Sequence, residues 1–135
     1  MNETIYSKKA KEFRKAFSLK NSMTRSSLML STRLISEEYK ELLEAVEACT
    51  KDMWLRPTGA EIRLRENLLK ELVDLVYVCH QMAVTFGWDL DEAYTRVHDS
   101  NMSKLDEEGK PIYREDGKIM KGPNYFTPTL TDLIQ

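Results

Sequence analysis

Apolar residues recur at intervals of three and four over most of the first hundred positions, which is the period of an α-helix with one buried face. The pattern predicts helices over residues 3–19, 24–51, 60–86 and 90–103. Gly87 follows the third helix, where glycine commonly ends a helix in a left-handed conformation, and Asp89 or Asp91 can cap the fourth. The expected fold class is therefore all-α.

The third predicted helix is apolar on nearly every side between Leu72 and Val84. A helix of this kind is usually surrounded by protein, so we expect it in the middle of a core. Two long helices of this composition carry more apolar surface than a chain of 135 residues can cover alone. The sequence thus predicts a four-helix bundle-like protomer that forms a homo-oligomer, a tetramer in preference to a dimer.

Charged, Gly- and Pro-bearing sequence follows the last predicted helix and forms an extended tail over residues 104–135. Within it, residues 112–114 and 118–120 flank the Asp116-Gly117 pair, which predicts a β-hairpin because such a pair supplies the positive φ angles of a tight turn. Residues 1–20 are expected to form a short docking helix. With no internal repeats, residues 1–135 are interpreted as a single domain.

Charge is distributed unevenly along the chain. Residues 8–25 contain seven bases and one acid, whereas residues 37–47 contain five acids and one base. A net charge of -2 argues against stable nucleic-acid binding, so the basic segment is interpreted as a solvated helix face. No apolar run is long enough for a membrane span, and Cys49 and Cys79 lie in helical stretches as small buried side chains; we therefore expect a cytoplasmic protein.

Acidic residues occupy positions of the second helix where an apolar residue is expected. Projected at the helical period, Glu38 falls inside the apolar arc and Glu41 at its margin, whereas Glu37 lies toward the polar face. Glu38 and Glu41 are three residues apart, close enough to contact one ion. For Glu37, as for Glu44 and Glu47, a solvated surface position remains an equal alternative.

The third helix repeats this arrangement with Glu71 and Asp74, also three residues apart. Asp74 interrupts the apolar run, where a short side chain is not expected to reach solvent, and a lone buried carboxylate would cost several kcal/mol or would have to protonate. One alternative is a buried ion pair of Asp74 with an arginine. The arginines considered for this role are Arg33, Arg63 and Arg65.

Two helices that each present an acid pair predict a site of up to four carboxylates, which favours a hard divalent cation. Mg²⁺ is the expected cofactor and Mn²⁺ a substitute. Zinc and a ferritin-like di-iron site are disfavoured, because neither His80 nor His98 forms a Glu-x-x-His pair with these acids. Both histidines are interpreted as hydrogen-bonded or surface residues.

The spacing Glu-Glu-x-x-Glu at residues 37–41, followed about thirty residues later by Glu-x-x-Asp at residues 71–74, resembles the all-α nucleoside triphosphate pyrophosphohydrolase superfamily, which includes the MazG proteins. Residues 100–104 and 121–125 resemble the C-terminal part of bacteriophage MazG-like proteins, so the likeness covers roughly residues 34–125. The resemblance implies four metal ligands. They are Glu38, Glu41, Glu71 and Asp74.

The implied reaction is Mg²⁺-dependent hydrolysis of a nucleoside triphosphate, with a deoxynucleotide favoured, to monophosphate and pyrophosphate, and the implied role is nucleotide-pool control. Glu37 and Glu38 are the expected catalytic residues, Glu37 by orienting water or accepting its proton.

Asn101, Lys104 and Lys121 are expected to bind the phosphates, and Trp54 either packs or stacks on the base. Phosphoribosyl-ATP pyrophosphohydrolase and a non-catalytic helical interaction protein are the alternatives.

Overall fold

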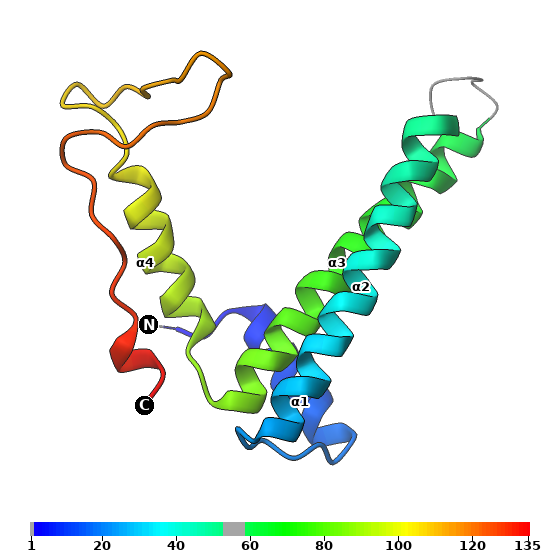
Figure 1. The fold of residues 1–135 in the computed structure, drawn as a ribbon. Coiled ribbons are helices and arrows are strands. Elements are labelled where there is room, and N and C mark those ends of the chain that lie inside the picture. Colours follow the sequence, from blue (N-terminus) through cyan, green and yellow to red (C-terminus); the bar gives the residue numbers. More distant parts are fainter. Residues whose placement is uncertain (1, 53–58) are drawn as a thin grey trace. The chain divides into compact units, whose positions relative to one another are not determined.

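The computed structural model describes residues 2–52 and 59–135. The helices are α1 (Ile5–Ala16), α2 (Arg25–Asp52), α3 (Ala60–Phe86), α4 (Leu90–Met102) and the 3-10 helix η1 (Thr131–Leu133) (Figure 1). The described part of the chain has four α-helices and no strand, which confirms the all-α prediction, and each α-helix agrees with its predicted range to within three residues.

The described residues form two compact units. One spans residues 4–87 and holds α1 to α3, and the other contains residues 88–135, with α4 and the tail. A bundle that includes α4 remains a prediction.

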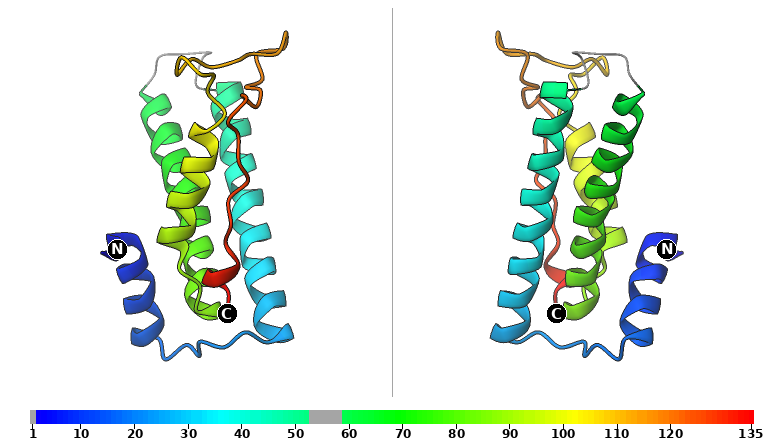
Figure 2. Two further views of the ribbon diagram at one scale, coloured as in Figure 1. Left: turned by 90° about the vertical axis from the view of Figure 1, so that its left-hand side faces the viewer. Right: turned by 90° about the vertical axis from the view of Figure 1, so that its right-hand side faces the viewer.

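In the first unit, α2 and α3 form an antiparallel pair and α1 packs on α3 (Figure 2). The buried apolar residues are small, among them Ala45 of α2 and Ala83 of α3. Small side chains let helix backbones approach closely, so the paired faces are tight but bury little apolar volume.

The contact of α1 with α3 combines aromatic packing with buried polar groups. Phe13 meets the Tyr77 ring edge to face, with a centroid distance of 5.6 Å. Gln81 is buried, donates a hydrogen bond to the carbonyl of Ala10 at 3.4 Å and accepts one from Arg14 at 3.3 Å. These contacts hold α1 against α3.

The helix ends use the residues that the sequence suggested. Gly87 ends α3 with φ 73°, and its N–H donates to the carbonyls of Ala83 and Val84. Asp89, one of the two predicted caps, accepts a hydrogen bond at 3.0 Å from the N–H of Glu92 at the start of α4. Both signals depend on local backbone geometry alone, which explains why they could be predicted.

Within the unit that holds α1 to α3, α3 is not surrounded by protein on every side. Leu72, Val73 and Val76 are exposed, and so is Cys79, whereas Cys49 is buried as expected. In its unit, α3 packs against α2 and α1, and two neighbours do not enclose the whole circumference of a helix.

In the second unit, the tail folds back along α4. The Ser100 hydroxyl donates to the carbonyl of Phe126 at 2.7 Å, and the N–H of Phe126 donates to the Ser103 hydroxyl at 3.1 Å. Arg96 donates to both carboxylate oxygens of Asp132 at 2.7 and 2.9 Å and to the carbonyl of Thr129 at 3.0 Å. These bonds hold the C-terminal residues against the helix.

The predicted β-hairpin is not supported. Pairing in this part of the tail is limited to an isolated antiparallel bridge between Tyr113 and Ile119, although Gly117 adopts the expected positive φ, 84°. Residues 111–121 are exposed, and a short two-stranded ribbon without an apolar face to pack is only marginally stable.

None of the helices in the described part of the chain has an apolar stretch of the length that a membrane span requires.

Candidate functional site

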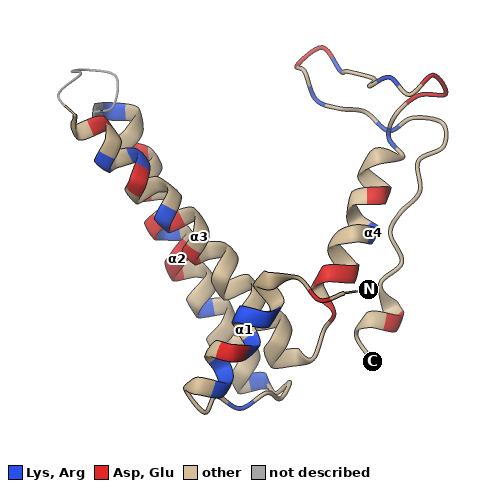
Figure 3. Ribbon diagram, turned by 180° about the vertical axis from the view of Figure 1, so that it is seen from behind, with Lys and Arg blue, Asp and Glu red and all other residues tan. Residues whose placement is uncertain are grey.

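Three of the predicted acids converge where α2 faces α3. Glu38, Glu71 and Asp74 each offer one carboxylate oxygen, and these three oxygens lie within 4.8 Å of one another. The helical period places Glu71 and Asp74 on one side of α3, and the antiparallel pairing brings Glu38 of α2 opposite them. Figure 3 shows acidic positions along α2 and α3 from their middle onward, with bases among them, whereas bases dominate α1.

The three acids differ in how deeply they are buried. Glu71 is only 8% exposed, and Glu38 is half-buried. Glu38 Oε2 and Glu71 Oε2 are buried atoms without a hydrogen-bond partner among the described residues. Leaving a charged oxygen buried and unsatisfied costs about 1–3 kcal/mol or more, so the arrangement is suited to an external cation. Carboxylate oxygens are the donors that Mg²⁺ and Mn²⁺ prefer, and the residues present therefore fit such an ion.

The electrostatics of Glu38 reflect this convergence. Burial raises the pKa of the Glu38 carboxyl above its ordinary value, because it disfavours the charged form. The negative charges of Glu41, Asp74 and Glu71 raise this pKa further, and the ammonium of Lys70 offsets part of the effect. The site therefore carries an excess of negative charge.

Asp74 is more exposed than predicted, and its ion pair is not the arginine pair considered as an alternative. Its side chain is 35% exposed, so it does reach solvent, because the α3 surface beside it is not covered within the unit. Within the described residues its ion-pair partner is Lys70, one turn earlier in α3, and not an arginine, with a distance of 2.8 Å between Nζ and Oδ2.

Lys70 is the site residue that the sequence analysis missed. Its Nζ also lies 3.3 Å from Glu71 Oε1. Hydrogen bonds to Asp74 and then to Glu71 raise the pKa of the Lys70 ammonium above its ordinary value. The signal was present in the sequence, because Lys70 and Asp74 are four residues apart on one helix, a spacing at which opposite charges pair.

The other predicted residues of the acidic segment lie outside this group. Glu37 and Glu41 are exposed, although Glu41 is close enough for its charge to act on Glu38. His98 is exposed, and His80 packs against the Tyr6 ring with its Nδ1 buried and unpaired among the described residues. Neither histidine joins the three acids. Trp54 lies outside the described residues.

The predicted phosphate-binding residues belong to the second unit. Asn101 is exposed near the end of α4, and its carbonyl accepts a hydrogen bond from the N–H of Lys104 at 3.2 Å. Lys121 lies in the tail, with Nζ 4.7 Å from the centre of the Tyr125 ring. A Cβ on Gly122 would lie 2.6 Å from the Lys104 carbonyl oxygen, so this glycine lets the tail pass close to Lys104. The backbone next to Lys121 therefore contacts the segment that carries Lys104.

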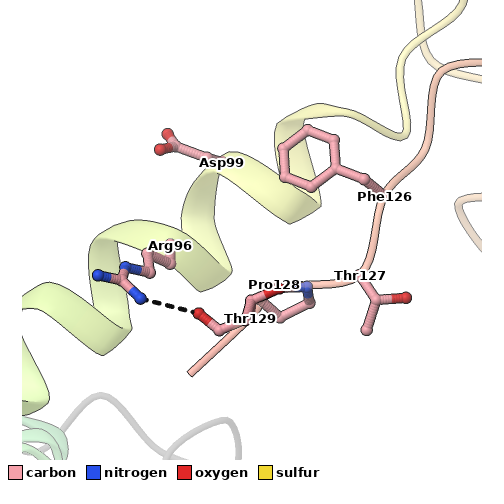
Figure 4. Close-up of a pocket in the computed structure, with 6 residues that line it drawn as sticks. All are labelled: Arg96, Asp99, Phe126, Thr127, Pro128 and Thr129. Atoms are coloured by element: carbon pink, nitrogen blue, oxygen red, sulfur yellow. Dashed lines mark hydrogen bonds between the residues drawn. The ribbon is translucent and has the colours of Figure 1, made fainter. Parts of the chain in front are cut away.

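A pocket in the second unit has a volume of about 320 Å³ and is drawn in Figure 4. Arg96 and Asp99 of α4 form one side, and Phe126, Thr127, Pro128 and Thr129 of the tail form the other. The Arg96 side chain is already engaged with the Thr129 carbonyl and Asp132. None of the predicted site residues lines this pocket, so it is a gap beneath the tail and not the predicted site.

The geometry agrees with a comparison to known families. The family model described as PRA-PH, phosphoribosyl-ATP pyrophosphohydrolase, matches residues 1–101. The match includes all four predicted metal ligands and leaves out the tail. No curated protein matches the chain.

Proposed function

The chain belongs to the phosphoribosyl-ATP pyrophosphohydrolase family, a member of the all-α MazG-like superfamily that acts on nucleotides, and on this premise we propose that it is a Mg²⁺-dependent nucleoside triphosphate pyrophosphohydrolase. Its products are a nucleoside monophosphate and pyrophosphate, with deoxynucleotides as the favoured substrates. The observation that carries the proposal is the convergence of Glu38, Glu71 and Asp74, two of whose buried oxygens have no partner in residues 2–52 and 59–135.

In this proposal Glu38, Glu71 and Asp74 hold the metal, and Glu41 supplies a fourth carboxylate from the adjacent turn of α2. A bound Mg²⁺ would supply Lewis acidity to the phosphate oxygens and lower the pKa of a water molecule. Glu37 is exposed on the same helix, where its carboxylate can orient a water or accept its proton. Glu38 has the most crowded charge environment, which suits a residue that must face a cation.

Asn101, Lys104 and Lys121 are the proposed phosphate-binding residues. The contact of Gly122 with the Lys104 carbonyl supports a common role for Lys104 and Lys121, since both lie at one end of α4. Within the described residues Lys104 forms no ion pair, so its ammonium is available to an anionic ligand. Stacking of Trp54 on the base stays a prediction.

Phosphoribosyl-ATP is a second candidate substrate, favoured by the description of the family model. The matched segment ends at residue 101, however, and the tail that follows is folded onto α4 by Ser100, Ser103 and Arg96. The resemblance of this tail to bacteriophage MazG-like proteins supports nucleotide-pool control, and hence nucleoside triphosphates, as the first candidate. Both substrates would be cut at the bond between the α and β phosphates.

We also infer a homo-oligomer, with a tetramer favoured over a dimer. Leu72, Val73 and Val76 of α3 and Leu43 of α2 are exposed large apolar residues. Large apolar side chains that stay exposed in this number are commonly covered in an assembly. Analytical ultracentrifugation at micromolar concentration tests the inference, and a monomer under these conditions contradicts it.

A panel of nucleoside triphosphates, with phosphoribosyl-ATP included, tests the function through pyrophosphate release in the presence of Mg²⁺. The expected first products are monophosphate and pyrophosphate. Diphosphate and orthophosphate as first products would contradict the proposal. Glu44→Gln is a matched control for substitutions of Glu38, Glu71 or Asp74. Glu44 is exposed on α2 and lies outside this group of three acids.

Non-catalytic interaction through the basic face of α1 is the alternative from a different class. A metal-binding enzyme gains thermal stability from millimolar Mg²⁺ or Mn²⁺ by linkage, whereas a scaffold held by ion pairs does not. Melting temperatures with chelator and with metal therefore separate the two functions.

A further inference from the structure

Lys70 contacts the acidic group from its solvent side. Its ammonium lies 2.8 Å from Asp74 Oδ2 and 3.3 Å from Glu71 Oε1, and its side chain is 62% exposed. Glu71, in contrast, is almost fully buried. A flexible, solvated ammonium thus occupies the open side of a carboxylate cluster whose opposite side is closed.

This single ammonium does not satisfy the cluster. Glu71 Oε2 and Glu38 Oε2 have no partner among the described residues, although the other oxygen of Glu71 is bonded to Lys70. A lysine has one positive charge, whereas Glu38, Glu71 and Asp74 carry up to three negative charges. The inner oxygens are therefore left for a second cation.

A divalent ion that binds these three acids needs oxygens that Lys70 now contacts. Two like charges at the same oxygens would repel strongly, because the interaction grows as the separation falls. Exposed ion pairs of lysine with a carboxylate contribute little free energy, about 0–1 kcal/mol, so the ammonium can be displaced into solvent at small cost.

We propose that Lys70 is the internal counter-ion of the acidic site, and that its ammonium leaves Glu71 and Asp74 when a divalent cation binds. The inference rests on the proposed metal-dependent function and adds a residue that sets the metal concentration at which the site fills. Lys70 stabilises the α2–α3 pair without metal and weakens metal binding by competition. These two effects must accompany each other, since both come from the same contacts.

Lys70→Met tests the inference, because it removes the charge and keeps an unbranched side chain. The probe is Mn²⁺, titrated into the full chain and followed by electron paramagnetic resonance. Lys40→Met is the matched control: Lys40 is an exposed lysine of α2, and within the described residues it forms no ion pair. Both variants lose one positive charge, but only Lys70→Met loses the contact with Glu71 and Asp74.

We expect Lys70→Met to bind Mn²⁺ about fivefold more tightly than Lys40→Met, since a competing cation and its repulsion are gone. In chelator, Lys70→Met should melt roughly 2–4 °C below Lys40→Met. Lys70→Gln is a second variant, and helical circular dichroism establishes that each is folded.

Equal Mn²⁺ affinity in Lys70→Met and Lys40→Met, with wild type binding the ion, would overturn the counter-ion role and leave the proposed function standing. Weaker binding by Lys70→Met would also overturn it, because Lys70 would then assist the metal. If wild type binds no Mn²⁺ at all, the proposed function and the inference both fail.

Discussion

The two units differ in how their carboxylates are paired with positively charged side chains. In the second unit, Arg96 bonds both Glu92 and Asp132, and Arg114 bonds Asp116, so these carboxylates have guanidinium partners. In the first unit, three carboxylates converge, and Lys70 pairs with two of them. Two oxygens of this group are buried without a hydrogen-bond partner among the described residues.

The difference also appears in the pKa values of the acids. Hydrogen bonds from the arginines hold the pKa values of Asp132 and Asp116 below their ordinary range, whereas burial and like charges raise the pKa of Glu38. The Arg96–Asp132 pair holds the tail against α4, and its charges balance without a further ion. In a cluster with more carboxylates than cationic partners, the negative charges repel one another, and a bound cation reduces this repulsion. Such a cluster is therefore a candidate binding site.

The largest expected effect comes from Asp74→Asn, which keeps the shape and removes one charge from this cluster. Loss of a metal ligand should lower pyrophosphohydrolase activity about a thousandfold or more, since metal catalysis supplies several kcal/mol. In chelator the variant should melt at the same temperature as wild type or higher, because repulsion is reduced and Lys70 keeps Glu71. Steady-state kinetics and thermal denaturation measure both effects.

The opposite result would show that Asp74 does not differ from the paired acids of the second unit. A strongly lowered melting temperature in chelator, with Mg²⁺ making no difference to either protein, would make Asp74 a structural ion-pair residue like Asp132. Added Mg²⁺ should instead stabilise wild type more than the variant.

Lys104→Ala tests whether Lys104, which forms no ion pair within the described residues, binds the phosphates of the substrate. Because charge-assisted hydrogen bonds to phosphate are strong, KM should rise about tenfold with little change in melting temperature. Lys110→Ala is the control, since Lys110 pairs with Glu108 in an exposed tail segment. If the two variants have equal kinetics at low substrate, Lys104 does not bind the phosphates.

Arg96→Met should loosen the tail. The Arg96 bonds to Asp132 and the Thr129 carbonyl are lost, so amide exchange in residues 126–134 should become about three- to tenfold faster while α2 and α3 exchange as before. The folded-state pKa of Asp132 is lowered, so its contribution is present above the ordinary value of 3.8 and is lost as pH falls through the folded value. Wild-type exchange should therefore approach that of the variant in acid, and a pH-independent difference would contradict the pairing.

The smallest effect is a pH dependence of stability in chelator. The pKa of Glu38 is raised by folding, so its ionised form costs stability above the folded value, and the cost is absent below the ordinary value of 4.5. The wild-type melting temperature should thus lose roughly 1–3 °C relative to Glu38→Gln as pH rises above that value. If the melting temperatures of the two proteins change in parallel between pH 4 and 8, the ionised Glu38 carboxylate is not repelled by its neighbours in the folded state.

The sequence by itself determined the local features of this protein. The four α-helices, the left-handed end at Gly87, the cap at Asp89 and the inward positions of Glu38, Glu71 and Asp74 all follow from helical period and terminal residues. These depend on neighbours within one or two turns, and that information is contained in the segment itself.

Only the tertiary structure decided which charges meet and which surfaces stay open. The register of α2 against α3 brings Glu38 to Glu71 and Asp74 and leaves Glu41 exposed. The apolar run of α3 predicted burial, but the number of neighbouring helices determines how much of its surface is covered, and in its unit it has α1 and α2 alone. The turn at Gly117 formed without strands because a local turn signal does not supply the apolar partner that a ribbon needs. Contacts between distant segments depend on which faces pack together, and helical period does not specify that choice.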